Sequence, residues 1–295
     1  MKYSYYHKPN NENVMGNSFK KVLIIFVSAL FCIGLSARPP IATKQQIGMF
    51  MNSKTCVVLE AANIAYSSNI KDAVQKYWKS TSFEFIDGAE FEKRRFDSKY
   101  SFLVLTKGVF AADPSGVSYS YIRLVLGSTT SDIANMPEFC SVPLSYTDDN
   151  NGDFEFAIPS IVKFIQNHVQ VLNKKHFIIE LNGLNYYNNI RNFRDKVLLL
   201  NKEKMAPDAD SPEKISTIYP YYIKLLNSSE IAKELASSPE KTLFSFHVGA
   251  PKNSAAGKCF DMIFDVEGNL YYYNERDITN QNGDGFNLAN FKSIR

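Results

Sequence analysis

The sequence is poor in the residues that most often carry chemistry. It has four cysteines and four histidines among 295 residues, and no two cysteines have the Cys-x-x-Cys spacing of redox or zinc sites. P-loop, G-x-G-x-x-G, G-x-S-x-G and H-E-x-x-H motifs are also missing, so nothing indicates nucleotide binding, serine hydrolysis or metalloprotease activity. These absences favour a protein without a cofactor and with no dedicated catalytic centre.

An excess of charge of one sign is missing as well. The first 37 residues hold four basic residues and one acidic residue, and the rest of the chain carries 29 of each. A neutral chain has no broad field that attracts phosphates, so nucleic acid is not an expected partner. The basic segment Lys93-Arg94-Arg95 is predicted to be a solvated helix face.

The one long apolar segment lies near the N-terminus. The basic pair Lys20-Lys21 precedes an uncharged segment from Val22 to Ala37 that ends in small residues. This order is typical of a secretory signal peptide, so residues 1–37 are predicted to be a cleaved leader, and translation from Met15 would give a leader of ordinary length. The segment is shorter than the ~20 residues that span a bilayer, and a retained signal anchor is the alternative.

The cysteines fit an exported protein without lipid or redox chemistry. Cys32 follows Phe31, where lipid attachment needs a small residue, so the chain is not predicted to be a lipoprotein. The remaining Cys56, Cys140 and Cys259 allow one disulfide at most. The predicted location is the periplasm or the outer envelope, with no membrane span after removal of the leader.

Hydrophobic periodicity predicts a repeated α/β unit. In residues 38–150 strand and helix patterns follow the order β-α-β-α-β-β, and the order recurs in residues 194–295 after a helical linker at 151–193. Strands joined through a helix must be parallel, whereas the final hairpin is antiparallel. The connectivity is predicted to be that of a thioredoxin-like domain, without its Cys-x-x-Cys, or of a generic α/β sandwich such as an anticodon-binding-like unit.

The predicted helix starts carry matching caps in the two copies. The segment FIDGAEFEK (85–93) aligns without gaps on LLNSSEIAK (225–233). Asp87 and Asn227 are the predicted N-caps, each followed three residues later by a glutamate that completes a capping box. Asn69 is predicted to cap the first helix of the first copy.

The linker contains an amphipathic helix that opens at Pro159. Its apolar face must be buried, and we expect it to pack on the sheet of the first copy or in the seam between the copies. The apolar face consists of Ile161, Val162, Ile165, Val169 and Leu172.

Three segments resemble a family of exported proteins from Bacteroidota. They are FIQNHVQVL, SDIANMPEFCSVPLSY and KYWKSTSFEFIDGAEFEK. The resemblance extends over most of the mature chain and implies export and a bacterial envelope setting. It implies no reaction type and provides no catalytic residues to transfer.

The catalytic candidates lie at the predicted hairpin of the second copy. His247 and Cys259 flank its loop, and Asp261 follows. A thiol, an imidazole and a carboxylate can form a nucleophilic site, although a buried thiol and a strand-edge histidine give the same pattern. His168 and His176 have no Cys or His partner at metal-ligand spacing, so no metal site is predicted.

Two polar segments and two tyrosine clusters complete the candidates. Asp148–Asp153 and Asn280–Gly285 resemble half of a calcium loop but lack its bidentate glutamate, so polar turns are predicted. Alternate tyrosines of a strand face opposite sides, and the exposed ones would suit a protein or glycan interface; half-buried sheet positions are the alternative. The candidates for partner binding are Tyr219, Tyr221, Tyr222, Tyr271 and Tyr273.

The sequence therefore favours an exported, non-catalytic binding or assembly protein of the bacterial cell envelope, with a protein or a glycan as its partner. One alternative is a thiol-dependent or hydrolytic enzyme that uses Cys259 and His247. Another is a small-ligand or glycan binder that uses the groove between the two copies.

Overall fold

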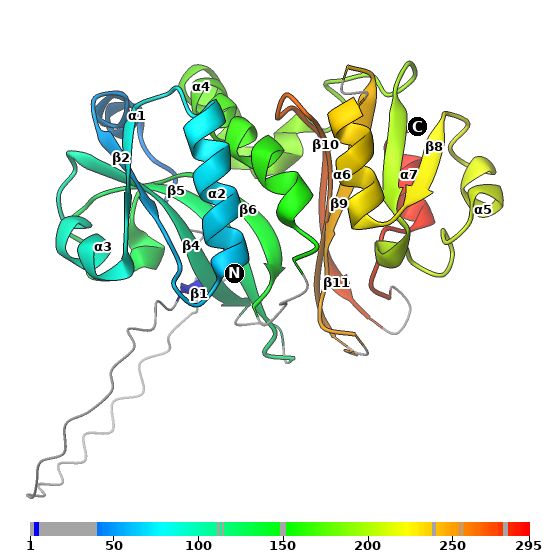
Figure 1. The fold of residues 1–295 in the computed structure, drawn as a ribbon, viewed down its shortest axis with the longest axis horizontal. Helices are drawn as coiled ribbons and strands as arrows, with labels where there is room; N and C mark the ends of the chain where they lie inside the picture. Colours follow the sequence, from blue (N-terminus) through cyan, green and yellow to red (C-terminus); the bar gives the residue numbers. More distant parts are fainter. Residues whose placement is uncertain are drawn as a thin grey trace, which may run out of the picture.

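A computed structural model shows two mixed five-stranded sheets that lie side by side with helices packed on them (Figure 1). The structure describes residues 3–5, 40–110, 113, 115–147, 152–237, 240–252, 254, 256–279 and 283–295. Almost all of the predicted leader, with Cys32, lies outside these residues, as do parts of both predicted calcium-like turns. Among the described helices none is both long and apolar enough to cross a membrane.

The first sheet has the strand order β3-β2-β4-β5-β6. Its strands are β2 (Lys54–Val58), β3 (Ser82–Ile86), β4 (Tyr100–Phe110), β5 (Ser118–Leu126) and β6 (Glu138–Tyr146). β2 is parallel to both neighbours, because α2 (Ile64–Tyr77) and α3 (Gly88–Arg94) connect these three strands. The β4-β5 and β5-β6 pairs are antiparallel, and the short β1 (Tyr3–Tyr5) pairs with the end of β4.

The second sheet repeats this order as β8-β7-β9-β10-β11. Its strands are β7 (Val197–Asn201), β8 (Ile223–Leu226), β9 (Thr242–Val248), β10 (Gly257–Asp265) and β11 (Leu270–Ile278). β7 is parallel to β8 and β9, the connecting helices are α5 (Pro212–Ser216) and α6 (Ser228–Ser237), and the last three strands are antiparallel. Each sheet therefore has a fifth strand, β6 or β11, that the sequence did not predict, and the short β1 adds a sixth strand to the first sheet.

Three further helices lie outside the sheet crossovers. They are α1 (Lys44–Met51), α4 (Ile158–Asn182) and α7 (Leu288–Ser293). Single 3-10 turns cover Ile133–Asn135, Glu155–Ala157, Gly183–Tyr187 and Lys202–Lys204. α4 follows β6 after the 3-10 turn at Glu155–Ala157, and α7 follows β11.

Both aligned helix caps are present. The Asp87 carboxylate accepts a hydrogen bond from the Glu90 backbone N–H at 2.7 Å. Asn227 forms a complete capping box, because its side chain accepts from the Glu230 N–H at 2.9 Å while the Glu230 carboxylate accepts from the Asn227 N–H at 2.8 Å. The predicted N-cap residues are thus confirmed in both units, but the predicted capping box is complete only at Asn227, because the Glu90 carboxylate pairs with Lys93 and Arg94 instead.

The predicted cap at Asn69 is wrong. α2 begins six residues earlier, and Asn63 is its N-cap, accepting from the Tyr66 N–H at 2.9 Å. Asn69 lies inside the helix, and its amide donates to the Ala65 carbonyl at 2.9 Å. The early start was not visible in the periodicity, because the first helical residue, Ile64, is exposed.

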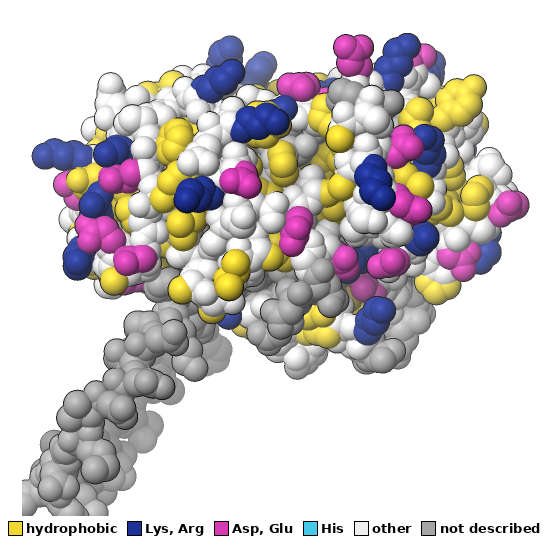
Figure 2. Space-filling view, in the orientation of Figure 1, with side chains coloured by type: hydrophobic (Ala, Val, Ile, Leu, Met, Phe, Trp, Pro, Cys, Tyr) yellow, Lys and Arg dark blue, Asp and Glu magenta, His cyan; other side chains and the backbone are white. Residues whose placement is uncertain are grey.

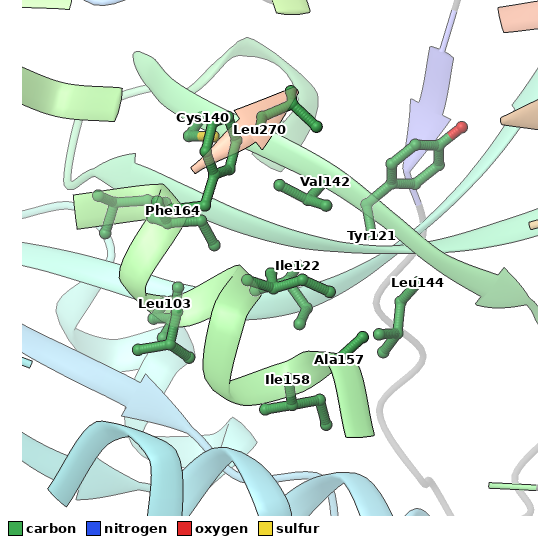
Figure 3. Packing of buried hydrophobic residues seen from close by; sticks show 14 of the residues in the cluster. Leu103, Tyr121, Ile122, Cys140, Val142, Leu144, Ala157, Ile158, Phe164 and Leu270 are labelled. Carbon is green, nitrogen blue, oxygen red and sulfur yellow. The ribbon is translucent and has the colours of Figure 1, made fainter. Parts of the chain in front are cut away.

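Helix α4 lies between the two sheets (Figure 1). All five residues of its predicted apolar face are fully buried. The helix packs on α2 and β6 of the first unit, and its Phe164 ring lies 5.6 Å from the Phe264 ring of β10. Figure 3 shows the start of the helix against Ile122 and Val142 of the first sheet. Both predicted positions, on the first sheet and in the seam, are therefore confirmed.

The shared core joins unlike faces of the two sheets. In β2, Val57 packs with α2 and α4 in the shared core, whereas Cys56 points to the opposite face, which Phe91 of α3 covers. In β7, Leu199 points into the shared core with α6, whereas Leu198 faces the outer cluster with α5 and α7. The first sheet thus contributes to the shared core the face that its first connecting helix, α2, covers. The second sheet contributes the face that its second connecting helix, α6, covers.

The basic segment in α3 is only partly a solvated face. Lys93 is exposed, as predicted. Arg94 instead forms ion pairs with Glu84 and Glu90 at 2.7 and 2.6 Å. The guanidinium of Arg95 is largely buried and donates to the backbone carbonyls of the loop at 130–131. Two of the three side chains therefore hold the α3 region together, and the prediction was wrong for them.

Candidate functional site

The hairpin of β9 and β10 brings the three catalytic candidates together with a fourth residue. His247 lies opposite Asp261 in the register, and its Nδ1 is 2.6 Å from the Asp261 Oδ1. The other ring nitrogen, Nε2, lies 2.9 Å from Oδ1 of Asp284, which comes from the loop after β11. The Cys259 thiol donates to this same oxygen at 3.1 Å. We call these four residues the His247 cluster.

Two neighbouring side chains hold the cluster in place. The Asn290 amide of α7 donates to Oδ2 of Asp261 at 2.9 Å. Nε of Arg276 lies 3.6 Å from the same oxygen. The terminal nitrogens of Arg276 donate to the carbonyls of Gly283 and Gly285, on either side of Asp284. The loop that carries Asp284 is therefore tied to β11 by hydrogen bonds from one arginine.

The cluster borders a small cavity in the seam between the two units. Its volume is about 40 Å³, and its lining combines Leu144 and Phe154 of the first unit with Ser245, His247 and Asp284 of the second. A space of this size holds only a few water molecules or an ion, not a sugar ring. A larger, open hollow of about 610 Å³ lies next to it, between Asp153 and Phe156 before α4 and Ser228 at the start of α6, so the groove between the units has room for the small-ligand or glycan binder predicted as an alternative.

Gly249 leaves the room that the Asp284 carboxylate occupies. A Cβ atom at position 249 would lie 2.0 Å from Oδ1 of Asp284. Any side chain larger than hydrogen at this position would push the carboxylate away from His247 and Cys259. The turn after β9 is therefore shaped to admit this acid.

The charges of the cluster favour an imidazole that is protonated at neutral pH. Burial alone would lower the pKa of His247, but the carboxylates of Asp261 and then Asp284 outweigh it and raise the pKa to about 9. Burial would raise the pKa of Asp284, but the hydrogen bond and charge of His247 lower it to about 2. At neutral pH both ring nitrogens donate, so the imidazole has no free lone pair with which to act as a base.

The thiol of Cys259 is held in its unreactive form. Burial, and next the negative charge of Asp284, raise the pKa of Cys259 far above its ordinary value. A nucleophilic cysteine needs the opposite environment, in which a base or cation stabilises the thiolate. The structure therefore places Cys259 near His247. However, both groups donate to the Asp284 carboxylate, so the imidazole does not activate the thiol.

Alkylation by iodoacetamide tests the state of this thiol. At pH 7.5 the native protein should react at least ~100-fold more slowly than the urea-unfolded protein, since all three described cysteines are buried and reaction requires opening of the structure. Mass spectrometry of peptides containing Cys259 measures the rate, and Cys140 in the first unit is the internal control. A rate at Cys259 far above that at Cys140 would revive the thiol-enzyme hypothesis.

The stability of the metal-free protein should fall at alkaline pH because of His247. Its folded pKa of about 9 lies above its ordinary pKa of 6.5, so its stabilising charge is complete below pH 6.5 and lost as the pH rises through 9. The expected loss of unfolding free energy is about 3 kcal/mol, and urea unfolding with a chelator present measures it. The His247→Gln variant has no charge to lose here; equal pH slopes in both proteins would contradict the assignment.

The other histidines have structural partners. His168 of α4 is buried, its Nδ1 lies 2.8 Å from the Tyr187 hydroxyl, and burial lowers its pKa to about 4, so it is neutral at pH 7. Nε2 of His176 lies 2.9 Å from the Ala42 carbonyl. Nδ1 of His176 lies 3.8 Å from the Glu180 carboxylate, and among the described residues neither histidine belongs to a group of three metal-ligand side chains.

The tyrosine candidates are mostly unsuited to partner binding. Tyr219 and Tyr271 are buried in the outer core of the second sheet, so their prediction as surface contacts was wrong. Tyr221 and Tyr273 are half-buried. Tyr222 is 79% exposed. Strand alternation predicted that some rings face inwards but did not show which ones, because the whole cluster at 219–222 precedes β8.

Asp284 is the member of the cluster that sequence reasoning missed. It lies in the predicted polar turn Asn280–Gly285, 23 residues beyond Asp261 in the sequence, and no spacing pattern links it to the hairpin. Among the described residues, one group of three side chains could hold a metal ion: His247, Cys259 and Asp284. Their ligand atoms all lie within 4.8 Å of one another.

Comparison of the chain with protein-family models, curated proteins and solved structures found no match to any of them.

Proposed function

We propose that this chain is an exported, non-catalytic binding or assembly protein of the bacterial cell envelope. The leader pattern and the resemblance to exported proteins support export and the envelope location. The protonated imidazole and thiol of the His247 cluster support a role without nucleophilic catalysis. Basic and acidic side chains are mixed on the face shown in Figure 2, which fits a protein partner better than a polyanion.

The observation that carries this proposal is an exposed apolar stripe at the end of α4. Beyond a non-helical residue, Lys175, the side chains of Phe177 and Leu181 are 69% and 62% exposed, and Ile178 between them is 40% exposed. They lie at helical spacings of three and four, so they form one face. We call these three residues the α4 stripe. Clustered apolar groups that stay in water mark interaction sites more often than scattered ones do.

The stripe and its surroundings fit a protein partner with an apolar face and an acidic rim. Lys44, Lys174 and Lys175 line a shallow hollow together with Phe177 and Ile178. Basic residues around an apolar centre complement acidic residues around an apolar patch on the partner. A glycan is less suited to this surface, since the stripe has one aromatic ring and no side-chain hydrogen-bonding group of its own.

We further propose that the two sheets descend from one duplicated unit in which a terminal helix follows the fifth strand. The shared strand order, the shared strand directions and the matching caps at α3 and α6 support a duplication. α4 and α7 would then be counterparts, and the predicted linker at 151–193 would belong largely to the first unit. The α4 stripe lies on the part of α4 that extends beyond the length of α7.

Binding through the stripe is testable with a matched pair of variants. Replacing Phe177 and Leu181 by glutamate should reduce partner recovery from envelope extracts at least ~10-fold, because two central apolar contacts at an interface contribute about 1–2 kcal/mol each. Recovery is measured by quantitative mass spectrometry, and a photo-reactive residue at position 177 identifies the protein that touches the stripe.

The control is Ile64→Glu, which changes an equally exposed apolar residue at the start of α2 without touching the stripe. It should leave recovery unchanged. Equal recovery by the wild type and the stripe variant, or no cross-linked adduct at position 177, would rule out the stripe as the binding site. Substrate turnover that disappears in a Cys259→Ala variant would overturn the non-catalytic proposal itself.

A further inference from the structure

We propose that His247, Cys259 and Asp284 bind one divalent transition-metal ion, with Zn²⁺ the best-matched ion, and that its fourth coordination position faces the cavity in the seam. This inference does not depend on the α4 stripe, which involves different residues on a different element. It concerns the only group of three metal-ligand side chains found among the residues that the structure describes.

The distances within the group are close to those of a tetrahedral site. Zinc binds sulfur at about 2.3 Å and nitrogen or oxygen at about 2.0–2.2 Å, so ligand atoms around it are about 3.3–3.8 Å apart. The Asp284 oxygen lies 2.9 Å from Nε2 of His247 and 3.1 Å from Sγ of Cys259. A displacement of this oxygen by roughly half an ångström would open the space that the ion needs.

The orientation of His247 is that of a metal-binding histidine. Its Nδ1 is hydrogen-bonded to the buried Asp261, so Nε2 points towards Cys259 and Asp284. A carboxylate on the second ring nitrogen is the usual outer partner of a metal-ligating histidine, because it fixes the ring and increases its basicity. Asn290 in turn holds the second oxygen of Asp261.

The three ligands differ in exposure in a way that suits metal uptake. The side chains of His247 and Cys259 project from paired strands and are buried. Asp284 is on a loop and its side chain is 44% exposed. Two buried ligands and one partly exposed carboxylate provide a preformed site with an entry path.

Binding of the ion is balanced in charge and protons. The metal replaces the Nε2 proton of His247 and the thiol proton of Cys259, and both protons pass to solvent. One ion of charge +2 thus replaces two protons, so the net charge of the buried cluster is unchanged. The cavity beside the cluster has room for the water molecule that fills the fourth position.

Cobalt(II) is the probe that tests the site, since it replaces zinc and absorbs visible light. Full-length protein treated with a chelator should bind one equivalent of Co²⁺, with visible bands of a tetrahedral ion and a near-ultraviolet band from thiolate-to-cobalt charge transfer. Added Zn²⁺ should abolish both and raise the melting temperature. Cys259→Ser should lose the charge-transfer band, whereas Cys140→Ser, at a buried thiol outside the cluster, should keep it.

Two further variants keep the test decisive if Cys259→Ser is unstable. Asp284→Asn changes a loop residue and should weaken Co²⁺ binding, and Asp261→Asn, which removes the outer carboxylate, should weaken it about 10–100-fold. No charge-transfer band in the wild type, or an unchanged band in the cluster variants, would overturn the proposal. Loss of metal binding with intact partner recovery would leave the α4 stripe standing, and the reverse result would leave the metal site standing.

Discussion

Replacing Asp261 by alanine should lower the free energy of unfolding of the metal-free protein by about 3–5 kcal/mol. The Asp261 side chain is fully buried, and it lies between the imidazolium of His247 and the guanidinium of Arg276. Its removal leaves these two cations close together, with only Asp284 to compensate, and it also leaves the Asn290 amide without its acceptor. Urea unfolding followed by circular dichroism at pH 7, with a chelator present, measures the loss.

The matched control for this variant is Asp277→Ala. Asp277 also pairs with a basic residue, Lys258, but its side chain is 69% exposed, so the loss should stay below about 1 kcal/mol. Asp261→Asn separates charge from shape, because the amide fills the same space without the negative charge, and it should fall between the two. If Asp261→Ala is no more destabilising than Asp277→Ala, the His247 cluster does not stabilise the fold.

Replacing Phe260 by alanine should destabilise the protein by about 3–5 kcal/mol. This buried ring of β10 lies 6.0, 5.4 and 6.1 Å from the rings of Phe110, Tyr119 and Tyr121 in the first unit. The Tyr119 hydroxyl also bonds to the Lys258 backbone across the same seam. The cavity left by the ring would therefore weaken the contact between the units as well as the second sheet itself. Urea unfolding measures the loss in the same way.

Hydrogen exchange distinguishes a seam effect from a local one. Phe260→Ala should speed amide exchange in both β5 and β10. Phe291→Ala is the matched control, because it removes an equally buried ring from the outer cluster of the second sheet. Faster exchange in that variant should be confined to the second unit. If Phe260→Ala leaves exchange in β5 unchanged, the two units unfold independently.

The parts of the fold that sequence predicted are those fixed by local chemistry. The caps at Asp87 and Asn227 satisfy free backbone N–H groups from within three residues, so they are visible without tertiary information. The apolar face of α4 is equally local, since five residues share one helical stripe. β6 and β11 were missed because Pro143 interrupts the first and charged residues occupy the second half of the other.

The candidate site was only half predictable for the same reason. The hairpin rule places His247 and Asp261 near each other, because their strands are consecutive and antiparallel. Asp284 reaches them through a loop whose course depends on Arg276 and on the missing side chain at Gly249. Because the sequence did not place Asp284 beside the hairpin, it indicated an activated thiol. In the structure the thiol instead donates a hydrogen bond to the Asp284 carboxylate.

The junction of unlike sheet faces has a consequence for how such a chain can grow. Two identical faces related by a twofold axis cover each other and end the assembly, whereas a head-to-tail contact leaves one free face of each kind unless a ring closes. The outer face of the second sheet is of the kind that the first sheet turns towards its neighbour, and it is α7 that lies there. In the duplication proposed above, this short helix would be the end cap of a two-member series, and a third member would have to displace it.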